Sequence, residues 1–322
     1  MRRLRDSRAV LAYRMMRIRR AEETLAERYR EQEMRTPTHF SIGQEAVAVG
    51  VCAALNRDDV VYSGHRCHAH YLAKGGDLPA MVAELYGKET GCARGRGGSV
   101  HLNDPAAGVI ASSAILGQTM AVAVGSALAF KLDGSERVAV TFFGDGTVEE
   151  GIFHESVNFA AVKGLPVIFV CENNGYSTHT PLPVRQPDHV SIHARAASYG
   201  IASTRVDGND VFAVHEAARE AVGRARRGHG PCLLECMTYR WREHVGPLWD
   251  YDKGYRTREE VESWIALCPI KRATDQLVAD GVWTRDDVSA LETELAAEVE
   301  QAIALAKAAP FPPTAELTVG TY

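Results

Sequence analysis

The sequence predicts an α/β fold with a doubly wound, mostly parallel sheet, an N-terminal helix and a C-terminal helical annex. Apolar runs at residues 138–143 and 167–171 enclose a helical stretch at 148–163, which makes a strand–helix–strand unit. A helical crossover of this kind joins parallel neighbours in a sheet. Strand-like and helix-like segments also alternate before and after this unit, as they do in doubly wound sheets.

An amphipathic helix is expected first, within residues 1–35. Its apolar side chains recur at helical spacing: Leu11, Met15, Ile18, Leu25 and Tyr29. Eight arginines between Met1 and Arg20 leave a transit peptide or a nucleic acid-binding arm as the alternative. Because glutamates follow at positions 22, 23 and 27, a helix that docks on the rest of the chain is favoured.

Four regular elements are expected between this helix and the strand–helix–strand unit. They are a helix at 43–55, a strand at 58–63, a helix at 78–86 and a helix at 119–132. The last of these consists largely of small residues and is suited to close packing. The glycine- and arginine-rich stretch 91–99 is expected to be a flexible basic loop.

The alternation continues in the second half of the chain. Asp210 is the expected N-cap of a helix at 211–227, after a turn at 206–210. A buried strand at 232–238 and helices at 259–280 and 285–308 follow, while 177–186 and 241–256 are expected to be irregular. We therefore expect a single domain over residues 1–322, with a helical segment at about 1–35, an α/β core at about 36–256 and C-terminal helices at about 257–310.

Composition limits the classes of function. The chain is 46% hydrophobic and 24% charged, as is usual for a globular protein. A net charge of −5 argues against a nucleic acid partner, and no apolar run approaches the ~20 residues that span a membrane. The seven cysteines include no CxxC pair, which argues against a zinc site, and their odd number argues against a disulfide framework. A reducing cytoplasm is the expected location.

Two short motifs follow the two strands of the central unit. Gly144-Asp145-Gly146 ends the first strand, and Asn173-Asn174 ends the second after 26 intervening residues, 147–172. Either motif alone is a common loop sequence. Parallel strands, however, bring their carboxyl ends to one edge of the sheet, so Asp145 and Asn174 should converge there. Their oxygens suit Mg²⁺, which takes few protein ligands and completes its shell with phosphate and water. The pair predicts a Mg²⁺-bridged diphosphate site.

This spacing resembles the thiamine diphosphate signature, and the likeness extends over nearly the whole chain. Four further segments occur in the expected order: 39–46, 63–70, 97–101 and 239–244. Together they resemble the α subunit of the decarboxylating component of 2-oxo acid dehydrogenases, of the pyruvate and acetoin type. His65-Arg66 favours the acetoin type. The resemblance implies a sheet of the thiamine diphosphate-binding type, with thiamine diphosphate and Mg²⁺ as cofactors.

The resemblance assigns roles to individual residues around the diphosphate. It implies Asp145, Asn174 and the backbone carbonyl of Tyr176 as metal ligands. Gly146 and Thr147 would offer backbone N–H groups to phosphate at the start of a helix, where anions are favoured. Binding of the cofactor is further assigned to three basic side chains and to two residues that line its aminopyrimidine ring: His65, Arg66 and Arg240, and Ser113 and Ile115.

Two histidines are the expected catalytic residues. His39 and His244 match active-site histidines of the family, and His244 also lies near the diphosphate; an imidazole can donate or accept a proton near neutral pH. For four others, a structural role is equally consistent with the sequence: His68, His70, His101 and His154. The altered loops 177–186 and 241–256 should flank the entrance for a small-molecule substrate.

The resemblance also implies partners. In the family, a glutamate that activates the cofactor comes from a β subunit, so a heterotetramer of two α and two β chains is expected. A lipoyl acyltransferase is a further expected partner, whereas nucleic acid and membrane are not. The first hypothesis is a dehydrogenase subunit that passes an acyl group to a lipoyl domain. The alternatives are a two-component carboligase or transketolase-like enzyme of a biosynthetic pathway, and a regulatory subunit without turnover.

Overall fold

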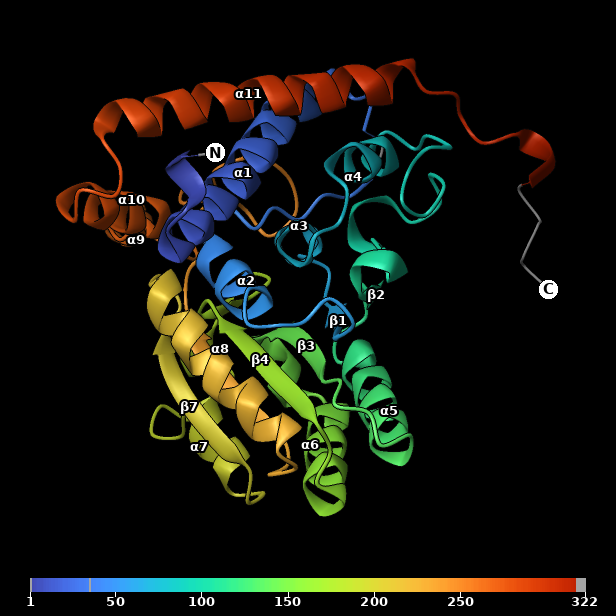
Figure 1. The fold of residues 1–322 in the computed structure, drawn as a ribbon, viewed down its shortest axis with the longest axis vertical. Coiled ribbons are helices and arrows are strands. Elements are labelled where there is room, and N and C mark those ends of the chain that lie inside the picture. Colours follow the sequence, from blue (N-terminus) through green and yellow to red (C-terminus); the bar gives the residue numbers. More distant parts are fainter. Residues whose placement is uncertain (1, 35, 317–322) are drawn as a thin grey trace.

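The computed structural model describes residues 2–34 and 36–316. Its centre is a six-stranded, all-parallel sheet in the order β2-β1-β3-β4-β8-β7 (Figure 1). The strands are β1 Val60–Ser63, β2 Val109–Ser112, β3 Ala139–Gly144, β4 Val167–Asn173, β7 Ala202–Asp207 and β8 Cys232–Met237. The predicted α/β class and doubly wound sheet are confirmed.

Helices cover both faces of the sheet, because successive side chains of a strand point to opposite faces. Phe142 of β3 packs on the side of α2, α3 and α8, whereas Phe143 packs on the side of α5, α6 and α7. These helices are α2 Glu45–Cys52, α3 His68–Lys74, α5 Gln118–Leu132, α6 Gly151–Lys163, α7 Ile192–Ala197 and α8 Val211–Arg226. Both faces are buried, as is usual for a parallel sheet.

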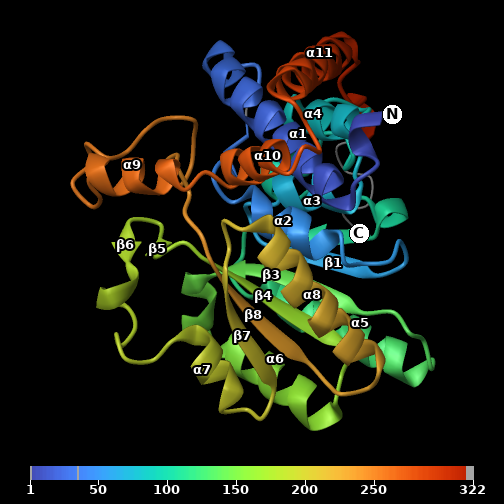
Figure 2. The ribbon, with the colours of Figure 1, turned by 60° about the vertical axis from the view of Figure 1, so that its left-hand side comes forward.

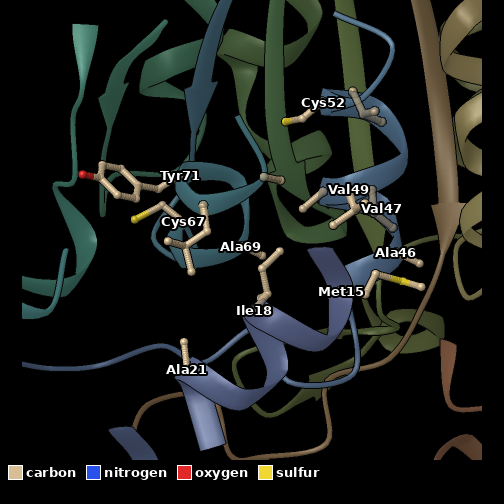
Figure 3. Close-up of a cluster of buried hydrophobic side chains, with 14 of the residues drawn as sticks. Met15, Ile18, Ala21, Ala46, Val47, Val49, Cys52, Cys67, Ala69 and Tyr71 are labelled. Atoms are coloured by element: carbon tan, nitrogen blue, oxygen red, sulfur yellow. The ribbon is translucent and has the colours of Figure 1, made fainter. Parts of the chain in front are cut away.

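A further helical layer lies beyond α2 and α3 and joins the two ends of the chain. α1 (Ser7–Arg28) buries Met15 and Ile18 against α2 and α3 (Figure 3). α11 (Arg285–Ala308) crosses α1 and packs along α4 (Leu78–Leu85), at the top of Figure 1. The docking helix expected near the N-terminus is therefore present.

The N-terminal arginines pair with acidic residues of the helices on which α1 packs. Arg17 donates to Glu298 of α11 at 2.7 Å, and Arg28 donates to Glu300 at 3.0 Å. Arg19 makes a bidentate pair with Glu45 of α2 in the interior, at 2.5 and 2.8 Å. The arginine cluster thus serves packing within the chain. Among the described helices, none is both long enough and apolar enough to cross a membrane.

Several segments differ from the sequence prediction. The helix expected at 259–280 is two helices, α9 (Arg258–Ala266) and α10 (Pro269–Ala279). The break occurs because Pro269 lacks an N–H group and disfavours helical backbone at the residue before it. Residues 177–186, expected to be irregular, include a small hairpin of β5 (Tyr176–Ser177) and β6 (Thr180–Pro181), which lies near α9 in Figure 2.

The basic loop 91–99 is ordered around one buried carboxylate, contrary to the expected flexibility. Glu84 of α4 is 1% exposed and accepts four backbone N–H bonds, from Ala93, Gly95, Gly97 and Gly98, at 2.7 to 3.0 Å. A carboxylate held by several backbone donors fixes the chain that wraps it. The sequence pattern missed this loop because the carboxylate lies on a separate helix.

Candidate active site

A cavity of about 290 Å³ opens at the carboxyl ends of β1, β3 and β4. Gly64, Gly144 and Asn174, at or just beyond the ends of these strands, line it. From β1 the sheet extends through β2 on one side, whereas from β3 it extends through β4 on the other. The cavity therefore lies at a topological switch point, where open α/β sheets bind their ligands.

Asp145 is buried in the turn that follows β3. Its side chain is 1% exposed, Oδ2 forms an ion pair with Arg185, and burial raises the pKa of the carboxyl above its ordinary value. Within residues 2–34 and 36–316, no group donates a hydrogen bond to Oδ1. A buried carboxylate oxygen without a partner is unfavourable, and a bound cation would remove that penalty.

Asn174 lies at the same edge of the sheet, just after β4. The parallel strands β3 and β4 are paired so that Gly144 faces Glu172, which brings their carboxyl ends together. Its Nδ2 donates to Gln44 Oε1 and its Oδ1 accepts the N–H of Tyr176, both at 3.1 Å. A carbonyl oxygen has two lone pairs, so Oδ1 keeps one for a further partner. Asn173, by contrast, donates to Glu235 at 2.8 Å.

Gly146, Thr147 and Tyr176 also line the cavity. A Cβ on Gly146 would lie 2.5 Å from Ser177 Oγ and 2.9 Å from Ser177 Cβ, so the close approach of the two loops requires glycine. Gly146 and Thr147 belong to a 3₁₀ turn, Asp145–Glu149, that precedes α6. They therefore lie at the start of this 3₁₀ segment, whereas α6 starts only at Gly151.

Arg66 brings a buried positive charge to the cavity. Its side chain is 7% exposed, and it donates to the backbone carbonyls of Phe40 and, at 3.3 Å, His244. Burial, together with the nearby Arg240 charge, lowers the pKa of Arg66 to about 10. Its hydrogen bonds to other described residues include none to a carboxylate. A buried cation without a counter-ion is unfavourable, and a bound anion would supply one.

Three imidazoles meet at the cavity wall from separate segments. His39 precedes α2, His65 follows β1, and His244 lies after β8; their ring centroids are 4.7 to 5.2 Å apart. Burial, with the charge of Arg66, lowers the pKa of His39 to about 2 and the pKa values of His65 and His244 to about 3. All three rings are therefore neutral at physiological pH.

Comparison with known proteins finds relatives that match most of the chain. A model of the dehydrogenase E1 component family matches residues 13–315. The chain is 39% identical over 321 residues to the α subunit of acetoin:2,6-dichlorophenolindophenol oxidoreductase from Bacillus subtilis (strain 168), covering 99% of this chain and 95% of the relative. It is 41% identical over 313 residues to the Cupriavidus necator protein of that name, covering 96% and 92%.

The chain belongs to the dehydrogenase E1 component family. It is also 38% identical over 307 residues to the pyruvate dehydrogenase E1 component subunit alpha of Porphyra purpurea, covering 92% of this chain and 87% of the relative. The resemblance to α subunits of the pyruvate and acetoin type is confirmed. Membership of the family implies thiamine diphosphate as the cofactor, and these relatives favour a dehydrogenase over a carboligase.

Arg240 does not line the cavity of this E1 chain, although it was expected to bind the cofactor. Its guanidinium is 1% exposed and donates to Asp250 at 3.1 Å, to Tyr255 at 2.9 Å and to the carbonyl of Thr178 at 2.8 Å. Asp250 also binds Arg256 at 2.7 Å. This network of buried charges holds together the loop that carries His244.

Ser113 and Ile115 also line the cavity, in the turn before α5. Ser113 Oγ donates to Gln118 at 2.5 Å and accepts the N–H of Ile115 at 3.1 Å, which fixes the turn before α5. Ile115 is 65% exposed although it lines the cavity. This wall is therefore open to solvent in the isolated chain.

The four histidines whose role the sequence left open each have a hydrogen-bond partner. His68 binds Glu22 at 3.1 Å and Ser99 at 2.8 Å, and His70 Nδ1 binds Ser63 at 2.7 Å. His101 and His154 contact the carbonyl of Ser112 and the hydroxyl of Tyr199, at 3.1 and 2.7 Å. Of the four, only His70 lines the cavity, so the structure favours a structural role for the other three.

Sequence reasoning missed several residues of the site. Gln44 and Glu172 line the cavity, and Arg185 holds Asp145. Gln44 lies in a segment that carries the family resemblance, and Glu172 directly precedes Asn173-Asn174, so both could have been considered. Arg185 gave no signal, because its partners Asp145 and Glu149 lie 40 and 36 residues away in sequence.

Proposed function

We propose that this chain is the α subunit of a thiamine diphosphate- and Mg²⁺-dependent enzyme. It cleaves a 2-oxo acid or acetoin-like substrate and transfers the acyl group to a lipoyl acceptor. The observation that carries the proposal is the buried, unsatisfied Asp145 Oδ1, which lies beside Asn174 at the carboxyl ends of two neighbouring parallel strands. The relatives named as acetoin and pyruvate dehydrogenase subunits support the substrate class.

Asp145, Asn174 and the backbone carbonyl of Tyr176 hold the Mg²⁺ ion in this proposal. All three offer oxygen, which Mg²⁺ prefers, and a set of three leaves positions for diphosphate oxygens and water. Arg185 binds Asp145 Oδ2 and so fixes the carboxylate with Oδ1 free. Groups that orient a ligand in this way are a usual part of metal sites. The donor set thus fits the ion.

The diphosphate is bound by Arg66, with His65 beside it and backbone N–H groups of Gly146 and Thr147. Among the described residues, the guanidinium of Arg66 donates hydrogen bonds to backbone carbonyls alone, so a diphosphate would give its charge a partner. Arg240 serves here by holding the His244 loop. This role takes the place of the direct contact with the cofactor that the resemblance implied, because both terminal nitrogens of Arg240 already donate to Asp250, Tyr255 and backbone carbonyls. Its Nε atom has no partner among the described residues.

Ser113 and Ile115 face the ring end of the cofactor, which supplies an electron sink for cleavage of the carbon–carbon bond. His39 and His244 handle protons at the substrate. A neutral imidazole can accept a proton at one ring nitrogen and donate one from the other. The Nδ1 atom of His39 accepts no hydrogen bond from the described part of the chain, so it is available to a substrate hydroxyl.

A β subunit completes the site, in a heterotetramer of two α and two β chains. Exposed apolar side chains on two neighbouring helices support this proposal: Val122 and Leu132 on α5 and Phe159 and Val162 on α6 are 41 to 77% exposed. These two helices lie side by side (Figure 1). Together with Ile115, they form a surface that a partner would cover. The whole chain acts as one domain, since α1 and α11, which lie near opposite ends of the chain, pack against each other in one helical layer.

Calorimetry of thiamine diphosphate binding tests the metal assignment. The chain is co-expressed with its β subunit, and Mg²⁺-dependent binding is compared for the wild type, Asp145→Ala and Asn174→Ala. Both variants should lose Mg²⁺-dependent binding. Asn173→Ala is the matched control, because Asn173 contacts Glu235 instead of the cavity. Unchanged affinity in the first two variants would refute the assignment.

Turnover of the reconstituted enzyme tests the substrate class. Pyruvate, longer 2-oxo acids, acetoin and sugar aldehydes are offered with the dye 2,6-dichlorophenolindophenol as oxidant, and separately with a lipoyl domain as acyl acceptor. Dye reduction with pyruvate or acetoin, and acylation of the lipoyl domain, are expected. Formation of a carbon–carbon bond product without dye reduction would contradict the dehydrogenase proposal.

A further inference from the structure

His39, His65 and His244 form a cluster whose geometry suits metal binding as well as proton transfer. Their ligand nitrogens all lie within 4.8 Å of one another. The three rings come from segments far apart in the sequence, so neighbouring positions in the chain do not explain the cluster. Three imidazoles that converge in this way are a familiar ligand set for zinc, with a fourth position open.

The hydrogen bonding of these rings separates them from the other histidines of the cavity region. His68 and His70 each bind a side chain through a ring nitrogen. For the three clustered rings, no side-chain hydrogen bond to another described residue is present. Nδ1 of His39, a side chain only 9% exposed, is buried without a partner. Buried polar atoms normally find one, so this nitrogen points to a missing ligand.

We propose that His39, His65 and His244 bind a nitrogen-preferring divalent transition-metal ion such as Zn²⁺, at a site separate from the oxygen site of Asp145 and Asn174. The two sites differ in chemistry: imidazole nitrogen suits zinc, copper, iron and nickel ions, whereas carboxylate and carbonyl oxygen suit Mg²⁺. The ion would give the unpaired Nδ1 atom of His39 a partner.

The site needs a small adjustment to close around the ion. Zinc–nitrogen bonds of about 2.1 Å place tetrahedral ligands about 3.4 Å apart, against up to 4.8 Å here. His65 and His244 are only half-buried, and His244 lies on a loop, so rotation of these rings can supply the difference. The charge of Arg66 opposes a second cation and limits the affinity.

Occupation of this site would inhibit the proposed reaction, and this consequence alone rests on the proposed function. The ion would take the lone pairs of His39 and His244, which then could not exchange protons with a substrate. It would also narrow the entrance beside Arg66. Zinc inhibition should therefore compete with the substrate, be reversed by a chelator, and persist at saturating Mg²⁺.

Cobalt titration of the full-length chain tests the site without cofactor or substrate, so its outcome is independent of the proposed function. Excess Mg²⁺ is present throughout to occupy oxygen sites. The strong visible bands of tetrahedral Co²⁺ should appear and be displaced by one equivalent of Zn²⁺. Only weak octahedral bands, or bands of cobalt bound to thiolate, would overturn the proposal.

Three separate variants locate the ion. His39→Gln, His65→Gln and His244→Gln should each weaken Co²⁺ binding by at least about tenfold, the lower end of what loss of even an outer-shell partner costs. His229→Gln, at an exposed position after α8, is the matched control and should bind as the wild type does. Thermal unfolding checks that each variant folds. If one variant does not fold, the other two still test the site. Unchanged affinity in the folded variants would overturn the assignment.

Discussion

Asp250→Asn should release the loop that carries His244. The side chain of Asp250 is 0% exposed; one oxygen binds Arg256 and the other binds Arg240 and the Tyr255 hydroxyl. Asparagine keeps the shape but removes the charge, and it turns an N–H donor toward one of the two arginines. Both guanidiniums would then be buried without a counter-ion.

The size of the effect follows from these contacts. Removal of one partner of a buried ion pair costs about 3–5 kcal/mol. The two pairs share a carboxylate and their losses do not add. Both arginines also keep bonds to backbone carbonyls, Arg240 to Thr178 and Arg256 to Trp241. We therefore expect the free energy of opening the loop to fall by about 3–4 kcal/mol. At about 1.4 kcal/mol per factor of ten, the equilibrium constant for opening rises by a factor of about 100 or more.

The loss should appear locally, because a loop opens at a lower free energy than the whole fold. Hydrogen exchange of residues 239–256 should accelerate by about that factor, and turnover of the reconstituted enzyme should fall while thiamine diphosphate still binds. Asp252→Asn, an exposed neighbour, is the matched control. Burial raises the pKa of Asp250, but Tyr255 and Arg256 outweigh it and hold the pKa below its ordinary value. The carboxylate is therefore charged throughout the neutral range, and the effect should not vary there. Unchanged exchange in Asp250→Asn, or equal acceleration in the control, would refute the reasoning.

Three further predictions concern the same site and its partner. His244→Ala should lower kcat more than it lowers thiamine diphosphate affinity; a full rate would remove His244 from the mechanism. Burial and Arg66 lower the pKa of His39 to about 2, whereas an unfolded imidazole has a pKa near 6.5, so the unfolded chain binds the extra proton and stability should fall as the pH drops below about 6.5. The urea midpoint of His39→Gln should change less between about pH 7.5 and 5 than that of the wild type, and equal changes would contradict this. Val162→Asp on α6 should block assembly with the β subunit in size-exclusion chromatography, whereas Leu305→Asp on α11 should not.

The centre of the sheet could be predicted from the sequence, but its edges could not. β3 and β4 are buried on both faces and show continuous apolar runs. Within the six-stranded sheet, the two strands that the pattern did not predict, β2 and β7, are the two edge strands. β7 exposes the adjacent Thr204 and Arg205 and buries only Val206, because an edge strand needs little apolar surface. Composition alone cannot separate such a strand from a loop.

In the candidate site, too, some residues could be predicted from the sequence and others could not. Asp145 and Asn174 could be placed because each directly follows a recognisable strand, and strand ends converge by geometry. Arg240 was expected at the diphosphate, since an arginine in a cofactor loop is usually read as an anion ligand. Its actual partner, Asp250, lies in the same loop, but the pairing depends on how residues 239–256 fold back. Contacts of this kind leave no periodic signal.

This division has a consequence for specificity. The proposed ligands of the metal and the diphosphate lie at the ends of central strands, whose positions are fixed by backbone pairing and two buried faces. Thr178 and His244, by contrast, lie on loops held mainly by side-chain contacts with Arg240 and Arg66. Substitutions in these loops can reshape the entrance without moving Asp145 or Asn174. A change of substrate within this family should therefore require changes in 177–186 and 241–256, while the sheet end that binds the cofactor stays the same.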